Sequence, residues 1–568
     1  GSRPERVAVY RSWLIPVSTW ISLILFSFVR TVVPGQNESH YLTRARHFWD
    51  PAWLAGDFFL ESSSPHAFFY AVFGWIPLLL PFDTAAILGR CLALAVVAWG
   101  WCRLFSRLHP APAAPLWICW CWLLLAAIGN LSGEWLVGGV ESKVFSWGLA
   151  FAAASFLLDG RTVIAALLGG LAVSFHPVVG GWAALCAAAA TGLIWCDEWR
   201  IRQRQPAVAG PSAGGVALPA GTTPIAPPPG FPVQPDRRVL LSAAVAFLCA
   251  AVPGLWPAVR TLQGAAPAEQ FQGDFLQVFH RLAHHLDPLA FSSTAWFAYL
   301  GMFAVWVFGL VAARWLRPPW PAIGDPGYAT AWFHGFIAAA LLLAFAGVLA
   351  GIGPRPPHAM PGLAWRMKFL KLYPFRLADI LLPAAVSLLF CRLLWNLVSL
   401  RSHRVLAMNS LCSLALLTAL LLPAPDRRPG GLSPAAQREW ITACRWIEKH
   451  TPEDALFYAP NDAWGFKWWT ERREFVSYKD TPQGARGLLE WNRRLNRINR
   501  LISEDRMDTS GKPHSPLAFT RSELQALRAE TGITHLLVWW VWPFSIEPIY
   551  SNRLFRVYAL PAPDPASD

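Results

Sequence analysis

One acidic side chain stands where a carboxylate can act as a base. Glu38 lies a few residues beyond an apolar run at 13–33, and His40 and Tyr41, which could hold it in place, follow at once. A carboxylate near the boundary of hydrocarbon loses part of its hydration, which raises its pKa and makes it a stronger base. Glu38 is therefore a candidate general base for a hydroxyl group. A solvated loop acid is the alternative interpretation.

Cations interleaved with aromatic residues form a second candidate site, at residues 365–376. Guanidinium and ammonium groups bind phosphate through charge-assisted hydrogen bonds, and aromatic rings collect at the bilayer surface. We predict that this segment binds a phosphate group at the membrane surface. The alternative is a set of interfacial anchors whose long side chains reach water. The four cations are Arg366, Lys368, Lys371 and Arg376.

Two adjacent histidines, His284 and His285, lie in another polar segment, 260–294. His280, one helical turn before His284, would allow a metal pair, but no Glu stands between them as in the zincin pattern. Hydrogen bonding to a phosphate or a sugar is therefore favoured over a metal, and a loop histidine that is already satisfied within the protein is favoured over both.

Long apolar segments separate the polar segments that hold these candidate residues. The apolar segments must therefore position the candidate residues in the fold. With 54% apolar and only 15% charged residues, the chain is expected to be a membrane protein and not a soluble multidomain enzyme. Its net charge of +13 is expected to lie in loops that face anionic lipid, and nucleic acid is not an expected partner. Runs able to cross about 30 Å of hydrocarbon lie at 13–33, 85–105, 113–130, 143–158, 162–175, 178–196, 239–259, 295–315, 331–352, 377–398 and 403–422.

Arginine placement predicts the sidedness of these eleven runs. With a cytoplasmic N-terminus, the arginines of 200–204, 314–317 and 401–404 all lie on the cytoplasmic side, as the positive-inside rule requires. The Pro-, Gly- and Ala-rich segment 205–237 is then a disordered cytoplasmic linker. The short run 67–82 is expected to be interfacial or re-entrant. The segments expected outside are 34–66, 130–142, 260–294, 353–376 and everything from 423.

The chain becomes polar from residue 423 and predicts a small α/β domain there. Ser433 can cap a helix that ends near His450, and a second helix is expected around 491–502 because apolar residues recur at helical spacing. Strands are expected near 455–459, 474–478, 535–541 and 554–559. We therefore expect a transmembrane domain over 1–422 and an extracytoplasmic domain over 423–568.

The order of these motifs resembles the opening of the GT-C superfamily of polytopic glycosyltransferases, which includes protein O-mannosyltransferases and lipid A aminoarabinose transferases. Glu38 and Tyr41 occupy the acid-x-x-aromatic positions, Asp57 the Gly-Asp position, and Glu141 the acid of the next outer loop. The resemblance covers roughly residues 10–200. It implies an α-helical polytopic fold with about eleven transmembrane helices, interfacial helices and a small C-terminal α/β domain.

The resemblance also implies an activity. The chain would transfer a sugar, with inversion, from a polyprenyl-phosphate donor to an unidentified glycan, lipid or protein acceptor at the outer face of a bacterial inner membrane. Glu38 would be the base, and Asp57 and Glu141 would be supporting acids. Tyr41, the two histidines and the four cations would bind the substrates.

One departure from the family concerns metal binding. Asn37 stands where many members carry Asp, and the acid of the second loop is Glu instead of Asp. Because an amide replaces one carboxylate ligand, we assign no divalent cation and no other cofactor.

Two other classes of function remain open. The chain could be a transporter or flippase of an anionic or polyprenyl-linked lipid, or a non-catalytic subunit of a membrane complex. Acids inside the spans would favour transport, because proton relays and ion sites lie near the midplane of the bilayer. Only Asp379 comes close to that description, near the outer end of its run, and a transferase is therefore preferred.

Overall fold

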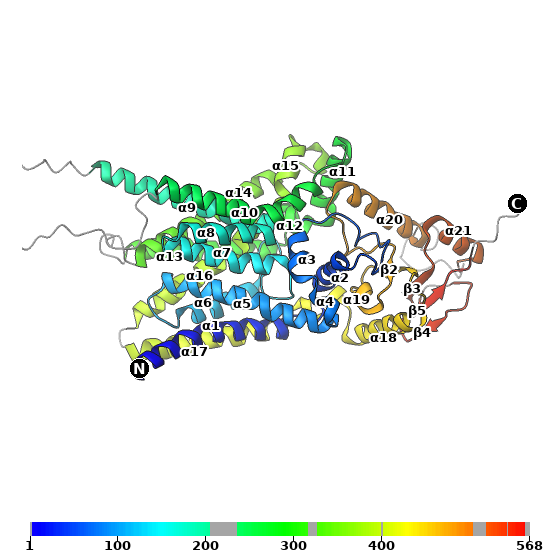
Figure 1. Cartoon of the computed structure of the whole chain (residues 1–568), viewed down its shortest axis with the longest axis horizontal. Helices are drawn as coiled ribbons and strands as arrows, with labels where there is room; N and C mark the ends of the chain where they lie inside the picture. Colours follow the sequence, from blue (N-terminus) through cyan, green and yellow to red (C-terminus); the bar gives the residue numbers. More distant parts are fainter. Residues whose placement is uncertain are drawn as a thin grey trace, which may run out of the picture.

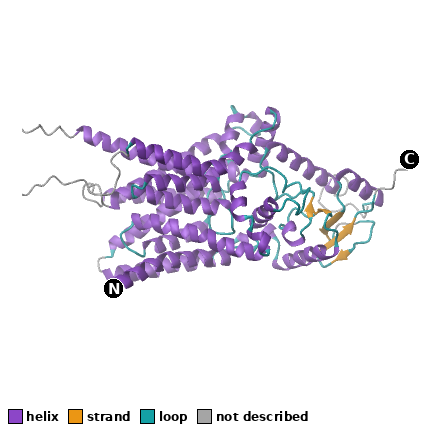
Figure 2. Cartoon of the chain, viewed as in Figure 1, coloured by secondary structure: helices purple, strands orange, loops and turns teal. Residues whose placement is uncertain are grey.

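The computed structural model describes residues 3–204, 236–315, 326–398, 401–503, 519–541 and 544–562. Long helices lie side by side and form a bundle, and a small sheet with its own helices stands at one end of it (Figures 1 and 2). The predicted linker 205–237 falls outside the described residues except for its last two positions.

The bundle contains all eleven predicted apolar runs as helices, because only a helix satisfies every backbone hydrogen bond in hydrocarbon. Within the described residues, eight helices are long and apolar enough to cross a membrane. These are α1 (Arg3–Arg30), α5 (Phe82–Leu108), α9 (Pro177–Arg204), α10 (Arg237–Thr261), α13 (Ser293–Trp315), α14 (Pro326–Gly351), α16 (Arg376–Leu397) and α17 (Arg401–Leu421). The shorter apolar helices are α6 (Ala114–Ile128), α7 (Ser142–Leu158) and α8 (Thr162–Phe175).

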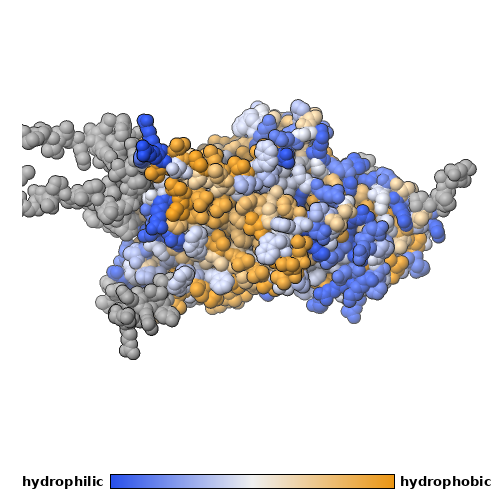
Figure 3. Space-filling model, viewed as in Figure 1, coloured by the Kyte–Doolittle hydropathy of each residue, from blue (hydrophilic) through white to orange (hydrophobic). Residues whose placement is uncertain are grey.

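The surface of the bundle agrees with a lipid environment. Apolar side chains cover the long helices on the face seen in Figure 3, and hydrophilic side chains cover the end that carries the sheet. The expected fold class is therefore confirmed: the chain is an α-helical polytopic membrane protein with a small α/β region near its C-terminus.

Glycines allow α5 and α7 to approach closely. A Cβ atom on Gly100 would lie 2.0 Å from the carbonyl oxygen of Gly148, and a Cβ atom on Gly148 would lie 2.6 Å from the backbone of Val96. Small residues at such crossings let helix backbones touch, which strengthens packing where lipid offers no hydrophobic driving force. The start of α7, where Glu141 lies, is thus placed against α5.

Short helices gather at the end of the bundle that faces the sheet (Figure 1). The run 67–82, which is predicted to be interfacial, contains two of them, and neither is long enough to span a membrane. A π-helix at Leu276–Arg281 precedes α12, so His280 and His284 do not share one α-helix. The short helices are α2 (Glu38–Trp49), α3 (Ala67–Phe73), α4 (Ile76–Leu79), α11 (Pro267–Phe275), α12 (Ala283–Leu286) and α15 (Leu363–Leu370).

The C-terminal region forms a five-stranded sheet in the order β2-β1-β3-β5-β4. Strand β1 pairs in parallel with β2 and β3, whereas β5 pairs antiparallel with β3 and β4. The side chain of Ser433 caps α18 as predicted, since it accepts a hydrogen bond from the backbone of Ala436. The strands are β1 (Leu456–Tyr458), β2 (Arg473–Glu474), β3 (His535–Trp539), β4 (Tyr550–Ser551) and β5 (Phe555–Ala559).

Two apolar cores hold this sheet between helices. Helix α18 (Pro434–His450) packs Trp440 and Ile447 against residues that include Phe457 of β1. Helices α20 (Ala485–Ser503) and α21 (Arg521–Thr531) contribute to the second core, which also contains Tyr458. The sequence predicts α18, α20 and four of the strands, although β2 is shorter than expected. It misses α21, β4 and the single-turn helix α19 (Phe466–Thr470).

The close crossing of α5 and α7 gives a test of the packing. Gly148→Ala places a methyl group against the backbone near Val96, and such overpacking costs about 1–3 kcal/mol. We expect a lower thermal midpoint in detergent. Gly181→Ala, in α9, is the matched control, because a Cβ atom there meets no atom within 4 Å. Equal midpoints for the two variants would contradict this packing.

Candidate functional site

Glu38 lies at the start of α2 and is fully buried in an ion pair with Arg90 of α5. Its Oε1 is 2.6 Å from Nε of Arg90, and its Oε2 is 2.5 Å from Nη2. The backbone N–H groups of Val140 and Gly35 donate to the same two oxygens at 2.8 and 2.6 Å. Each oxygen therefore already accepts two hydrogen bonds.

The structure places Glu38, the predicted base, inside a closed hydrogen-bond network, and its catalytic role stays a prediction. A carboxylate that accepts four donors and has no exposed surface offers no oxygen to a substrate hydroxyl. Arg90 also donates to the carbonyl oxygens of Thr31 and Val32, just after α1. The pair thus ties together α1, α2, α5 and the segment before α7. The feature of the sequence that could have indicated this pair is Arg90 itself, a charged residue inside an apolar run.

Asp57 is also a structural carboxylate. Its Oδ1 accepts hydrogen bonds from the backbone of Phe59 and Leu60 at 3.1 and 3.0 Å. Its Oδ2 accepts one from the backbone of Glu474, at 3.0 Å, and lies 3.8 Å from Nζ of Lys467. Both oxygens are engaged and the side chain is fully buried, so Asp57 fastens the loop between α2 and α3 to strand β2. Its role as a supporting acid stays a prediction.

Glu141 differs from the other two acids. It stands immediately before α7 and is buried, and Asn37 donates to its Oε1 at 2.8 Å. Among the described residues, its Oε2 has one ion-pair partner, Nζ of Lys143 at 3.4 Å. Burial raises the pKa of Glu141, although Lys143 and Asn37 oppose the shift. Of the three predicted acids, this one has the geometry of a base, and Asn37 is the group that holds it.

Arg376 and Glu134 add two further charges near the carboxylate of Glu141. Arg376, the first residue of α16, places Nε 2.9 Å from Oε2 of Glu134. Lys143 lies 3.6 Å from the other oxygen of Glu134, and that oxygen has no hydrogen bond within the described chain. Nη1 of Arg376 is 3.1 Å from Nε2 of His176. The sequence did not single out Glu134, Lys143 or His176 as members of one site.

Neutral aromatic and imidazole groups complete this cluster. The ring of His66 lies 5.4 Å from Tyr41 and 5.0 Å from His176, and its Nδ1 is 3.1 Å from Oγ of Ser142. Burial lowers the pKa of His66 to about 3 and that of His176 well below its usual value, and Arg376 adds to both shifts. Burial also raises the pKa of Tyr41. These side chains are therefore uncharged hydrogen-bonding groups at neutral pH.

The two predicted histidines lie at the edge of this region. Nδ1 of His285 is 2.5 Å from the carbonyl oxygen of Ser132, and its ring lies 6.5 Å from Tyr373. The ring of His284 lies 4.1 Å from that of His285. Burial lowers the pKa of both histidines. His285 is thus satisfied by backbone, as the alternative interpretation of the sequence allows.

The four predicted phosphate-binding cations do not converge. Arg366 donates to carbonyl oxygens where α14 ends, and Lys371 forms a 2.6 Å ion pair with Asp274. Lys368 is exposed, and Arg376 alone reaches the cluster around Glu141. The structure therefore does not bring these four residues together, and their binding of a phosphate stays a prediction. These cations are close in sequence but lie on a short helix and the turn after it, so their side chains point in different directions. Their spacing in the sequence does not reveal this.

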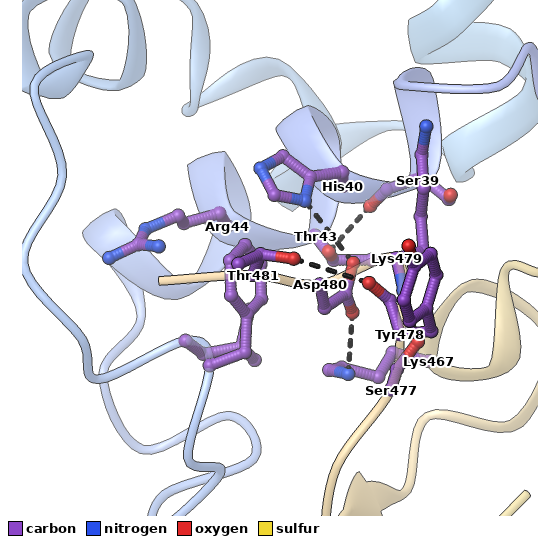
Figure 4. Close-up of polar contacts among 12 residues, drawn as sticks. Ser39, His40, Thr43, Arg44, Lys467, Ser477, Tyr478, Lys479, Asp480 and Thr481 are labelled. Atoms are coloured by element: carbon purple, nitrogen blue, oxygen red, sulfur yellow. Dashed lines mark hydrogen bonds and ion pairs between the residues drawn. The ribbon is translucent and has the colours of Figure 1, made fainter. Parts of the chain in front are cut away.

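A loop of the C-terminal domain, residues 477–481, closes over this end of the bundle, and Figure 4 shows its polar contacts. Oδ1 of Asp480 is 3.2 Å from Nδ1 of His40 in α2, and Oδ2 is 2.7 Å from Nζ of Lys467 in α19. Lys467 also donates to Oε2 of Glu474 at 2.7 Å. One buried network thus joins α2, α19, β2 and this loop.

Three buried acids share the single ammonium of Lys467. Burial raises the pKa of Glu474 to about 7; Lys467 opposes this shift, and the charges of Asp480 and Asp57 add to it. The same acids raise the pKa of Lys467 well above its usual range, despite burial. Lys467 and His40 lower that of Asp480. The network therefore contains one carboxyl group that titrates near neutral pH.

Comparisons with known proteins give one family match. A family described as a domain of unknown function (DUF6798) matches residues 438–498, which run from α18 into α20 and include the loop 477–481. No curated protein matches the chain.

Solved structures similar to the chain are membrane transferases. ArnT from Cupriavidus metallidurans bound to undecaprenyl phosphate is 13% identical, with 99% of each chain covered and a TM-score of 0.39. The oligosaccharyltransferase AglB from Archaeoglobus fulgidus, in complex with an inhibitory peptide and a dolichol-phosphate, is 10% identical. In that comparison 92% of this chain and 69% of AglB are covered, with a TM-score of 0.38.

The ion pair of Glu38 and Arg90 gives a prediction about stability. Glu38→Gln leaves the buried guanidinium of Arg90 without its counter-charge, and breaking a buried pair costs about 3–5 kcal/mol. We expect a clearly lower thermal midpoint of the full-length protein. The control is Glu453→Gln, at an exposed position, which should leave the midpoint unchanged. An unchanged midpoint for Glu38→Gln would argue against the structural role.

Glu474 gives a prediction about pH. Its folded pKa of about 7 exceeds the ordinary carboxyl value, so its contribution to stability is present at acid pH and is lost as the pH rises through about 7. Glu474→Gln mimics the protonated form. Its thermal midpoint should equal that of the wild type near pH 5 and exceed it by a few degrees near pH 8. A difference that stays constant over this range would refute the shift.

Proposed function

We propose that the chain is a GT-C-type glycosyltransferase that moves a sugar from a polyprenyl-phosphate donor to an acceptor hydroxyl. The observation that carries this proposal is Glu141, a buried acid with a raised pKa and one lightly engaged oxygen, surrounded by cations and neutral histidines. The cluster lies where the transmembrane helices meet the C-terminal domain, at the level expected for the head group of a membrane lipid.

The chemistry follows from these groups. The acceptor hydroxyl gives its proton to the carboxylate of Glu141, and its oxygen attacks the anomeric carbon opposite the phosphate. The bond between that carbon and the phosphate oxygen breaks, and the phosphate leaves with the electron pair. The configuration at the anomeric carbon is thereby inverted. Arg376 and Lys143 stabilise the negative charge of the departing phosphate. Tyr41, His66 and His176 are placed to donate or accept hydrogen bonds with the sugar.

A divalent cation does not fit this set of donors. Glu134 is paired with Arg376 and Lys143, and Glu141 is paired with Lys143. Asn37 points its amide nitrogen, a donor, toward Glu141. A metal site needs oxygen ligands that are free to converge on the ion, and here cations already occupy that position. The proposed reaction therefore uses no metal ion.

Transport is the rival function, and the environment of Asp379 favours transfer. The two oxygens of Asp379 accept hydrogen bonds from the backbone of Leu131 and Ser132, each at 2.9 Å, and from Oγ of Ser132 at 2.7 Å. The backbone N–H of Glu134 is a fourth donor, at 3.4 Å. A carboxylate fixed by four donors from one loop holds that loop in place and is poorly suited to relay ions. We place the cluster and residues 423–568 on the periplasmic side, where the arginine pattern predicts them.

Glu141 gives the test of this function. Glu141→Gln removes the proton acceptor with little change in shape and should lower the transfer rate about 10²–10⁴-fold. Donor binding and the thermal midpoint should change little. In the wild type the rate should rise with pH through a range above that of an ordinary carboxyl group, because burial raises the pKa of Glu141.

The matched control is Glu269→Gln, at an exposed acid of α11 that pairs with Arg486. It should transfer sugar at the wild-type rate. Transfer at full rate by purified Glu141→Gln, measured with radiolabelled polyprenyl-phosphate sugar in nanodiscs, would remove Glu141 from the mechanism.

A further inference from the structure

Lys479, in the loop 477–481, is a largely buried cation without an acid partner. Its ammonium lies 4.6 Å from the centre of the Trp464 ring. Among the described residues, no carboxylate oxygen lies within 4.0 Å of that ammonium, the limit for an ion pair. Burial is costly for a charge unless an opposite charge compensates it. Lys479 is therefore placed where an anion would bind well.

The charges around Lys479 come from both domains. Burial and the charge of Arg281 lower its pKa to about 8, although Glu141, Asp480 and Asp426 oppose this shift. Arg281 lies in the π-helix before α12, Glu141 precedes α7, and Asp426 follows α17. Lys479 thus belongs to the C-terminal domain but lies within the electrostatic reach of the candidate base.

The charge balance of the candidate site calls for such a cation. Arg376 and Lys143 offset Glu134 and Glu141, so these four groups together carry no net charge. A lipid phosphate brings at least one negative charge into this buried region, and a neutral cluster does not compensate it. Lys479 is a further cation within reach of Glu141, and the described chain gives it no ion-pair partner.

We propose that Lys479 completes the donor site by binding the lipid phosphate, so that donor binding and docking of the C-terminal domain stabilise each other. This inference rests on the proposed function. Asp480 is the positioning residue, because its contacts with His40 and Lys467 hold the loop from both sides. Arg281 also holds the loop by donating to Oγ1 of Thr481 at 2.8 Å.

The two events are coupled because the loop keeps Lys479 within electrostatic reach of Glu141 while Asp480 and Thr481 hold it against α2 and the π-helix. A ligand that binds the docked arrangement more tightly must stabilise docking by the same factor by which docking strengthens binding. Full-length protein in nanodiscs should therefore show slower hydrogen exchange in 477–481 with undecaprenyl phosphate than with undecaprenol. Asp480→Asn, which weakens the contact with Lys467, should reduce this difference.

The direct test compares the affinity of full-length protein in nanodiscs for undecaprenyl phosphate and for undecaprenol. Lys479→Met removes the charge and should weaken phosphate binding about tenfold or more, with no change for the alcohol. Lys479→Arg should retain most of the affinity. The matched control is Lys449→Met, at an exposed position of α18, which should behave like the wild type.

The outcomes separate the two proposals. A wild-type protein that prefers undecaprenyl phosphate, together with Lys479→Met of undiminished affinity, overturns the role of Lys479 and leaves the proposed function standing. A wild-type protein that binds the phosphate no better than the alcohol refutes the proposed function itself.

A pH series on the wild type remains decisive if Lys479→Met does not fold. Affinity for undecaprenyl phosphate should fall as the pH rises through about 8, where Lys479 loses its proton, while Lys479→Arg stays flat. The second ionisation of a phosphate monoester, near pH 6, is complete by then. A wild-type affinity that is constant from pH 7 to pH 9 overturns the inference.

Discussion

The buried ion pair of Glu38 and Arg90 is the interaction on which the candidate site depends. A guanidinium inside a bundle of apolar helices requires a counter-charge, and the carboxylate of Glu38 supplies it with bidentate geometry. The residues next to the pair are fixed with it. Asn37 precedes Glu38 in the chain, and Val140, whose N–H binds Glu38, precedes Glu141. The contact between Asn37 and Glu141 is thus set by a pair that itself does no chemistry.

Charge compensation in a low dielectric explains how the rest of the site is arranged. Acids at this end of the bundle are held by cations of other helices, as Glu134 is by Arg376 and Asp274 is by Lys371. Such pairs orient side chains strongly because an unpaired buried charge is costly. The same requirement makes an uncompensated charge such as Lys479 informative, since it marks a position where the protein alone does not complete the balance.

The sequence predicts the transmembrane fold well, because lipid demands continuous apolar runs that can be read directly from the chain. It also singles out Glu38 and Glu141, but it does not show that Glu38 is paired with Arg90. The physical cause is that the partner of Glu38 lies on another helix, and pairing across the bundle leaves no local pattern. The cations Arg366 and Lys371 mislead for the same reason, since their acceptors, carbonyls of α14 and Asp274, are distant in sequence.

The C-terminal domain shares its hydrogen bonds with the bundle, and this limits how it can move. Asp57 of the outer loop accepts the backbone N–H of Glu474 in β2, an edge strand whose free donors would otherwise face solvent. Asp480 binds His40 of α2 on the opposite side of the same network. Separating the domains would expose the sheet edge, take Asp57 away from Lys467 and break the contact of Asp480 with His40. Docking is therefore cooperative. Because the loop 477–481 is fixed in this way, the side chain of Lys479 is held in one place at the end of the bundle.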